Sequence, residues 1–288
     1  MKVIEHITRT KKTLFSFEIL PPLFKGSIEI VFDTLDSLME FYPPFINITY
    51  HRSECFRKSR QGTIGSCAAV TKKYNVETVP HLLSSVFYKN NIEDTFMNLQ
   101  FMGIENLFCL RGDSINCEKV GKKKLYALDL LKQVPDTINS KTFDLCLGVA
   151  GYIEKHFESP NPEMDLHYLN KKIEAGANYI ITQMFFENKK YFEFVKICRE
   201  KGISLPIIPG IKPIYCKYHL KRLPYNFYVA LPNELVKEAK NEKYIEKIGI
   251  EWGLKQSKEL KDSGVEIIHY YTMGRYNNIG KIIQMIYQ

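Results

Sequence analysis

A glutamate inside an apolar run is the first residue of this chain that could do chemistry. Glu18 stands between Phe17 and Ile19 in the stretch 13–20. A carboxyl group among apolar neighbours tends to have a raised pKa, which suits a general acid near neutral pH. The alternative is a carboxylate that faces solvent at the rim of the fold, and the residues alone leave both open.

A second candidate is the run Arg111-Gly112-Asp113, which follows four apolar residues at 107–110. An arginine can hold a phosphate through two hydrogen bonds, a glycine lets the backbone approach a ligand, and an aspartate adds a fixed negative charge. An Arg–Asp pair at the surface is the alternative. Cell adhesion through this triplet would need an exposed loop, which the apolar run before it argues against.

Other polar residues also stand at or near the ends of apolar runs. They are Thr49, His81, Tyr152, His156, Gln183 and Thr272. Gln183 is costly inside an apolar strand unless its amide has a partner, which could be a core group or a ligand. Thr49 and His81 also have ordinary structural roles open to them. His51 and Glu54 give only a weak metal signal, so we expect no metal site.

The runs that carry these residues alternate with segments of helical spacing. Strands are predicted at 13–20, 45–50, 77–83, 106–112, 145–152, 179–186, 205–211 and 265–272, with helices at 27–41, 90–103, 164–178 and 188–202. Nearly continuous apolar runs are typical of parallel strands covered on both faces.

Eight such repeats predict an α/β fold, a (β/α)8 TIM barrel in one domain over residues 1–288. Extra helices are expected between strands seven and eight, within 213–264. In such a barrel the polar groups at the carboxyl ends of the strands meet at one site. A doubly wound open sheet is the alternative, weakened by the absence of a G-x-G-x-x-G turn.

Composition limits the classes of function. The formal charge of +8 comes from dispersed basic residues, so we expect neither a nucleic acid nor a membrane as partner. The seven cysteines stand singly, which argues against disulfides, and Cys109 and Cys146 are expected in the core. With no signal sequence or apolar span in the sequence, we expect a cytoplasmic protein.

Several of these stretches resemble, in order, the motifs of methylenetetrahydrofolate reductase of the bacterial type. They are "FSFEILPP", "NITYH", "VPHL", "LRGD", "YIEKH", "EAGANYIITQMFF", "IIPGIKPI" and "HYYTMGR". The resemblance covers nearly the whole chain and implies a catalytic barrel with non-covalent FAD. NADH or NADPH would reduce the flavin, which would then reduce 5,10-methylenetetrahydrofolate to 5-methyltetrahydrofolate for methionine synthesis. A homo-oligomer is also implied.

The resemblance also implies residue roles. Glu18 would protonate N10 of the folate, and Asp113 would stabilise the cationic intermediate beside the flavin. Matching FAD-binding positions are Thr49, His81, Arg111, Gly112, Asp113, Tyr126, Ala127, Tyr152, His156, Asp165, Lys171 and Lys172. Matching folate-binding positions are Glu18, Asp113, Gln183, His219 and Arg275.

The chain departs from the family pattern at Tyr168, Lys171, His219, Leu223 and Gly274, which bears on ligand affinity and on the choice between NADH and NADPH. Two other functions stay open. A flavin-free barrel enzyme such as an aldolase would need a Schiff-base lysine, for which Lys212 is the candidate. A catalytically lapsed folate- or flavin-binding relative is the other, although Glu18 and Asp113 are retained.

Overall fold

A computed structural model describes residues 1–22, 26–50, 62–84, 92–112, 125–134, 144–273 and 276–288. Two predicted site residues, Asp113 and Arg275, lie outside these ranges, as do Gly274, His51 and Glu54.

The strands form one parallel sheet that closes into a ring. They are β1 (Leu14–Ile19), β2 (Phe45–Ile48), β3 (Glu77–Leu83), β4 (Asn106–Leu110), β5 (Cys146–Gly151), β6 (Tyr179–Thr182), β7 (Ile207–Ile208), β8 (Gly210–Ile211) and β9 (Ile267–Tyr271). Their order is β7-β6-β5-β4-β3-β2-β1-β9-β8. Because only Pro209 separates β7 from β8, the two ends of this order are halves of one strand. The predicted TIM barrel is confirmed, and the open sheet is wrong.

Pro209 explains why that strand is divided. A proline has no N–H to give to a sheet, although its carbonyl can still accept. Pro209 O accepts a hydrogen bond from His269 N at 2.9 Å, and Gly210 N donates to Thr182 Oγ1 at 2.9 Å. A Cβ atom at Gly210 would lie 2.5 Å from Thr182 O, so only glycine allows this approach. The first half therefore pairs with β6 and the second with β9.

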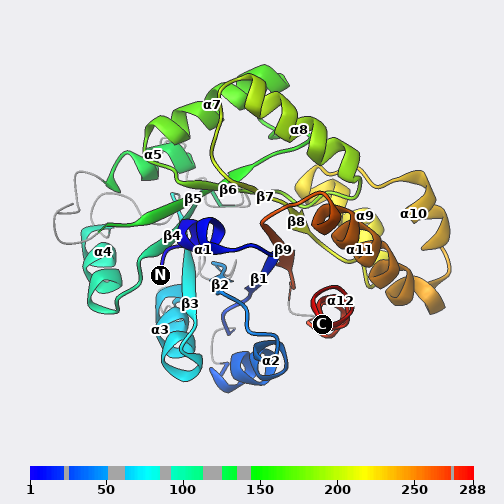
Figure 1. Ribbon diagram of the computed structural model, residues 1–288, viewed down its shortest axis with the longest axis horizontal. Helices are drawn as coiled ribbons and strands as arrows, with labels where there is room; N and C mark the ends of the chain where they lie inside the picture. Colours follow the sequence, from blue (N-terminus) through cyan, green and yellow to red (C-terminus); the bar gives the residue numbers. More distant parts are fainter. Residues whose placement is uncertain (23–25, 51–61, 85–91, 113–124, 135–143, 274–275) are drawn as a thin grey trace, which may run out of the picture.

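Helices surround the ring (Figure 1). They include α2 (Glu29–Met39), α3 (Thr63–Tyr74), α4 (Ile92–Phe101), α5 (Ala127–Leu131), α7 (Pro162–Glu174), α8 (Asn188–Glu200) and α12 (Asn277–Tyr287). The extra helices expected before the last strand are confirmed as α9 (Lys217–Phe227), α10 (Asn233–Glu238), the 3-10 turn η2 (Glu242–Tyr244) and α11 (Ile245–Asp262).

Helix α11 holds the chain that follows β8 in place. A Cβ atom at Gly249 would lie 1.8 Å from Ile214 O, so the helix backbone packs directly on this segment. Lys212 lies two residues before Ile214 on this segment.

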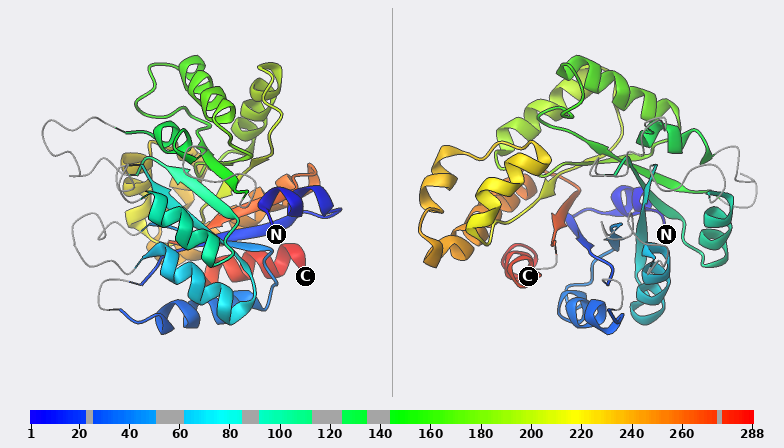
Figure 2. Two further views of the ribbon diagram at one scale, coloured as in Figure 1. Left: turned by 90° about the vertical axis from the view of Figure 1, so that its left-hand side faces the viewer. Right: turned by 180° about the vertical axis from the view of Figure 1, so that it is seen from behind.

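One end of the barrel is closed by α1 (Val3–Arg9), which the sequence did not predict (Figures 1 and 2). Val3 N donates to Asn106 Oδ1 at 2.8 Å, and the Met1 amino group donates to Glu77 Oε1 at 2.5 Å. Asn106 and Glu77 are the first residues of β4 and β3. Because α1 covers the amino ends of the strands, a site is left to the carboxyl ends.

Candidate functional site

Three of the predicted residues meet at the carboxyl ends of neighbouring strands. His81 Nδ1 of β3 lies 3.1 Å from Thr49 Oγ1 and 3.8 Å from Glu18 Oε2 of β1. The other ring nitrogen of His81 lies 3.1 Å from Asn47 Nδ2 of β2. The parallel register of β1 and β2 sets Glu18 beside Asn47, so sheet pairing itself assembles this group.

Burial decides the charges of this group. The side chain of Glu18 is 14% exposed, and burial raises its pKa to about 8, an effect that the nearby Lys212 partly offsets. Burial, with a smaller contribution from His269, lowers the pKa of His81 to about 3. At neutral pH the Glu18 carboxyl is therefore protonated beside a neutral imidazole. The expected raised pKa of Glu18 follows from its apolar surroundings.

Lys212 lies at the same end of the barrel. It is 2% exposed, and its Nζ donates to Thr272 O at 3.4 Å and lies 4.8 Å from the centre of the Tyr215 ring. Thr272 Oγ1 donates to Glu18 O at 2.6 Å, so Thr272 connects the two. Burial lowers the pKa of Lys212 to about 7, whereas the charge of Glu18 raises it. The sequence suggested Lys212 only as a Schiff-base lysine, and its place beside Glu18 was missed.

A second group of predicted residues surrounds the loop after β5. His156 N donates to Asp165 Oδ2 at 3.2 Å, and Ser159 Oγ donates to Asp165 Oδ1 at 2.8 Å. The rings of Tyr152 and His156 meet edge to face at 4.7 Å. Asp165, in the first turn of α7, therefore fixes the backbone of this loop.

Arg111 faces the same loop. Its guanidinium forms an ion pair with Glu158 and lies 5.1 Å from the centre of the Phe157 ring. Gly112 has a φ of 88°, in the left-handed region that favours glycine, and its carbonyl accepts from Arg111 Nε at 3.1 Å. The charge of Arg111 lowers the pKa of His156, after the larger effect of burial.

Lys172 supplies a second cation. Its Nζ donates to Ala150 O of β5 at 2.7 Å, and it forms no ion pair with the carboxylates of the described ranges. Burial lowers its pKa to about 8, and the charge of Asp165 raises it. An amine held in this way fits an anionic ligand that would replace the missing partner.

The remaining predicted cofactor residues lie farther toward solvent. Tyr126 is the N-cap of α5 and Ala127 is its first residue. Ser84 Oγ donates to Leu125 O at 3.1 Å and to Arg111 O at 3.4 Å, so the start of α5 lies beside Arg111.

Lys171, the residue before Lys172, has a side chain that is 44% exposed. It pairs with Glu174 on the exposed side of α7 at 2.8 Å. Tyr168, another departure on this helix, is 49% exposed.

The predicted folate residues line a different side of the ring. Gln183 follows β6 directly, and its Oε1 accepts from Met184 N at 2.9 Å. His219 of α9 is buried, with its ring 4.1 Å from that of Tyr215. Because Tyr215 also contacts Lys212, His219 lies on the same side of the barrel as Lys212. Leu223 is buried in the cluster that contains Met184.

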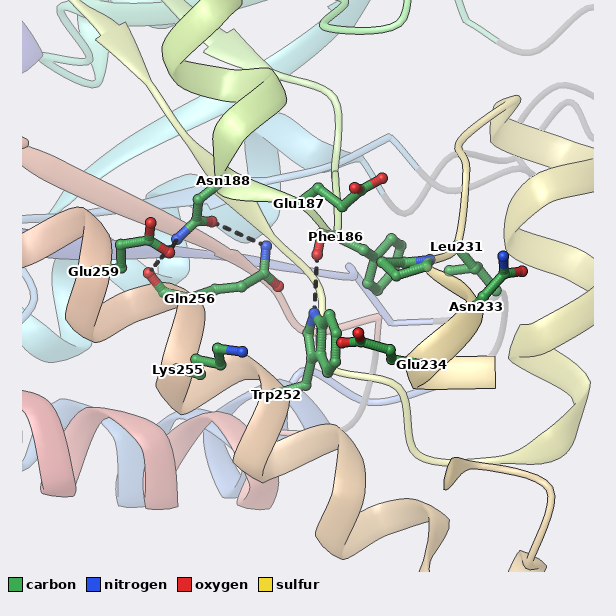
Figure 3. A pocket seen from close by; sticks show the side chains of 11 residues that line it. Phe186, Glu187, Asn188, Leu231, Asn233, Glu234, Trp252, Lys255, Gln256 and Glu259 are labelled. Atoms are coloured by element: carbon green, nitrogen blue, oxygen red, sulfur yellow. Dashed lines mark hydrogen bonds between the residues drawn. The ribbon is translucent and has the colours of Figure 1, made fainter. Parts of the chain in front are cut away.

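A separate hollow of about 470 Å³ lies between α8, α10 and α11 (Figure 3). Its polar side chains bind one another: Asn188 Nδ2 donates to Glu259 Oε2 at 2.8 Å, and Gln256 Nε2 to Asn188 Oδ1 at 3.2 Å. Trp252 Nε1 donates to Phe186 O at 3.0 Å. No predicted site residue lines this hollow, and its hydrogen bonds hold the helices together.

Within the described ranges, no three His, Cys, Asp or Glu side chains converge as a metal site. Over the same ranges, no helix has the length and apolar character needed to cross a membrane. Cys109 and Cys146 are free and buried, which confirms the sequence interpretation of both as core residues.

A parallel barrel with polar residues gathered at the carboxyl ends of its strands defines a class, the (β/α)8 barrels, whose functional sites lie at that end. The chain belongs to the methylenetetrahydrofolate reductase family, whose family model matches residues 3–287. The resemblance found in the sequence motifs is thereby confirmed.

Individual relatives agree. The "probable methylenetetrahydrofolate reductase (NADPH)" of Caenorhabditis elegans is 30% identical over 98% of this chain, which spans 43% of that protein. The "5,10-methylenetetrahydrofolate reductase" of Buchnera aphidicola subsp. Schizaphis graminum is 31% identical over 94% of this chain and 90% of its own length. The chain thus spans less than half of the nematode relative and most of the bacterial one.

A solved structure shows the same fold. A Clostridium thermocellum protein, described as binding two copies of 5-methyl-5,6,7,8-tetrahydrofolic acid, superposes with a TM-score of 0.65. It is 15% identical, and the match covers 99% of this chain and 97% of that one.

Proposed function

We propose that this chain catalyses the reduction of 5,10-methylenetetrahydrofolate to 5-methyltetrahydrofolate, with FAD as cofactor and NADH or NADPH as reductant. The observation that carries the proposal is the Glu18 carboxyl, 14% exposed and beside His81 at the carboxyl end of a barrel of this family, where burial raises its pKa. The names of the relatives and the folate ligand of the Clostridium thermocellum protein support the substrate class.

In this proposal Glu18 gives its proton to N10 of the folate, so that the five-membered ring opens. The neutral His81 keeps Thr49 and Asn47 in place and does not compete for that proton, since its pKa is about 3. Asp113, Gln183, His219 and Arg275 are proposed to orient the folate.

The cations of the β4–β5 side fit the phosphates of FAD. Arg111 and Lys172 would hold the anionic groups, with Glu158 exchanging its ion pair with Arg111 for water. Thr49, His81, Gly112, Tyr126, Ala127, Tyr152, His156, Asp165 and Lys171 complete the proposed contacts. When bound, FAD supplies the hydride transfer between NAD(P)H and the folate.

We further propose that residues 1–288 act as one catalytic domain in the cytoplasm, as a homo-oligomer. The continuous ring from β1 to β9 supports one domain. The free cysteines among the described residues, Cys67, Cys109, Cys146, Cys198 and Cys216, suit a reducing compartment.

The test is an anaerobic titration of the chain purified with FAD. Flavin absorbance should bleach on addition of NADH or NADPH, with the faster of the two identifying the reductant. Addition of 5,10-methylenetetrahydrofolate should restore the absorbance and yield 5-methyltetrahydrofolate. Failure to bind FAD, or a reduced flavin that the folate does not reoxidise, would contradict the proposal.

An aldolase would behave differently. It would be trapped by borohydride as a covalent adduct on Lys212 in the presence of a carbonyl substrate, with no flavin needed.

A further inference from the structure

Two buried ionisable groups, on the two sides of β9 at the carboxyl end of the barrel, influence each other electrostatically. Glu18 ends β1 and Lys212 follows β8, the two strands that flank β9. Thr272, which follows β9, donates through its hydroxyl to Glu18 O and accepts at its carbonyl from Lys212 Nζ. The closure of the ring at Pro209 therefore brings residues 18 and 212 together.

Lys212 has little else to hold its charge. Its single hydrogen bond to the described residues, to Thr272 O, is long at 3.4 Å, and the Tyr215 ring offers a cation–π contact at 4.8 Å. An apolar residue would fill this 2% exposed position without the cost of burying an amine. The role of the Lys212 charge therefore lies in its effect on Glu18.

Among the described residues, His81, His269 and Tyr271 do not change charge near neutral pH. From β3, His81 has a pKa lowered to about 3 by burial, and from β9, His269 has a pKa lowered to about 3 for the same reason. Burial raises the pKa of Tyr271 well above its ordinary value, and its hydroxyl donates to Thr182 O at 2.7 Å. Cys216 lies close enough for its charge to raise the pKa of Lys212.

We propose that Lys212 acts through Glu18: its ammonium stabilises the carboxylate that remains after proton transfer to the folate, and then returns a proton to it. In the first step the O–H bond of Glu18 breaks and an N10–H bond forms. In the second, an N–H bond of the Lys212 ammonium breaks and the O–H bond of Glu18 forms again. The resulting amine takes a proton from water.

The folate steps rest on the proposed function, whereas the electrostatic pair does not. The pair is tested by infrared titration of the full chain, with and without FAD. The carbonyl band of protonated Glu18 is identified by its loss in Glu18→Gln. Its midpoint is then followed with pH in the unmodified chain, in Lys212→Met and in Lys212→Arg.

The Glu18 titration midpoint should be lowest in Lys212→Arg, intermediate in the unmodified chain and highest in Lys212→Met. Lys212→Met removes the stabilising charge and should raise the Glu18 midpoint by about one pH unit or more. Lys212→Arg keeps a permanent charge and should lower it. The exposed Lys217, which pairs with Glu242 at 3.1 Å, provides the control Lys217→Met, with an unchanged midpoint expected. Circular dichroism confirms that each variant is folded.

An unchanged midpoint in both folded Lys212 variants would overturn the pairing, whatever the activity. If the midpoints shift, the pH limit of the folate half-reaction should move with them while flavin reduction by NAD(P)H stays constant. If they shift and the unmodified chain reduces no folate, the pair stands, while the proposed function and the proton return both fail.

Discussion

His81 Nδ1 lies 3.8 Å from Glu18 Oε2, yet the two side chains are not an ion pair at neutral pH. Burial holds the pKa of Glu18 at about 8 and that of His81 at about 3. Between these values both groups are neutral, so Glu18 keeps a proton that an imidazolium at His81 would help to remove. The site can therefore supply an acid at the pH of the cell.

The folate half-reaction should follow the ionisation of Glu18. Because the protonated carboxyl is the active form, the rate should be flat below pH 8 and fall about tenfold per pH unit above it. Stopped-flow reoxidation of the reduced flavin by 5,10-methylenetetrahydrofolate, from pH 6 to pH 10, measures this. A rate that rises through pH 8 would show that Glu18 acts as a base.

Glu18→Gln should stabilise the fold, and increasingly so as the pH rises. Glu18 has an ordinary pKa of 4.5 and a folded pKa of about 8, so its favourable contribution is complete below pH 4.5 and is lost as the pH rises toward 8. Glu18→Gln has no ionisable group at this position, so its stability does not fall in this way as the pH rises. Urea unfolding should show a gain of a few kcal/mol at pH 8 and almost none at pH 4.5. An equal gain at both values would contradict the burial of an ionisable Glu18.

Lys172→Met should weaken FAD binding by about tenfold or more, because a buried charge-assisted contact to phosphate is lost. Fluorescence titration of the chain with FAD measures the dissociation constant. The matched control is Lys189→Met, which removes the same charge from a side chain that is 88% exposed on α8. Equal affinity in the two variants would exclude Lys172 from the cofactor site.

Two glycine substitutions should have opposite effects on stability. A Cβ atom at Gly148, inside the barrel, would lie 2.3 Å from the Tyr179 ring, so Gly148→Ala should cost about 1–3 kcal/mol. Gly65 lies in α3 with nothing within 4 Å of its Cβ position, so Gly65→Ala should stabilise by about 0.5–1 kcal/mol. Urea unfolding of both variants gives the comparison. A stabilising Gly148→Ala would show that the barrel interior is not packed as described.

The strands were predictable because each is a short apolar run, and all eight predicted runs contain a strand. Helix α1 was missed because only Val3 and Ile7 of its seven residues are buried, too few for a helical pattern. The division at Pro209 was also missed, since it depends on pairing with both β6 and β9.

Part of the candidate site was also predictable from the sequence. Glu18, Thr49 and His81 stand at or near the carboxyl ends of neighbouring strands. Because the carboxyl ends of the strands of a (β/α)8 barrel meet at one site, the sequence alone predicts that these residues lie together. Lys212 was noticed only as a possible nucleophile, because its approach to Glu18 depends on ring closure across a sequence separation of 194 positions (212 − 18). The contact of Arg111 with Glu158 likewise depends on how two loops fold against each other.

Whether Glu18 donates the proton in the folate step is decided by the variant Glu18→Gln. Both half-reactions of this variant should be followed by anaerobic stopped-flow absorbance. We expect NADH or NADPH to bleach the flavin at the unmodified rate, and 5,10-methylenetetrahydrofolate to reoxidise it at least about a hundredfold more slowly. Reoxidation at the unmodified rate would show that Glu18 is not the proton donor.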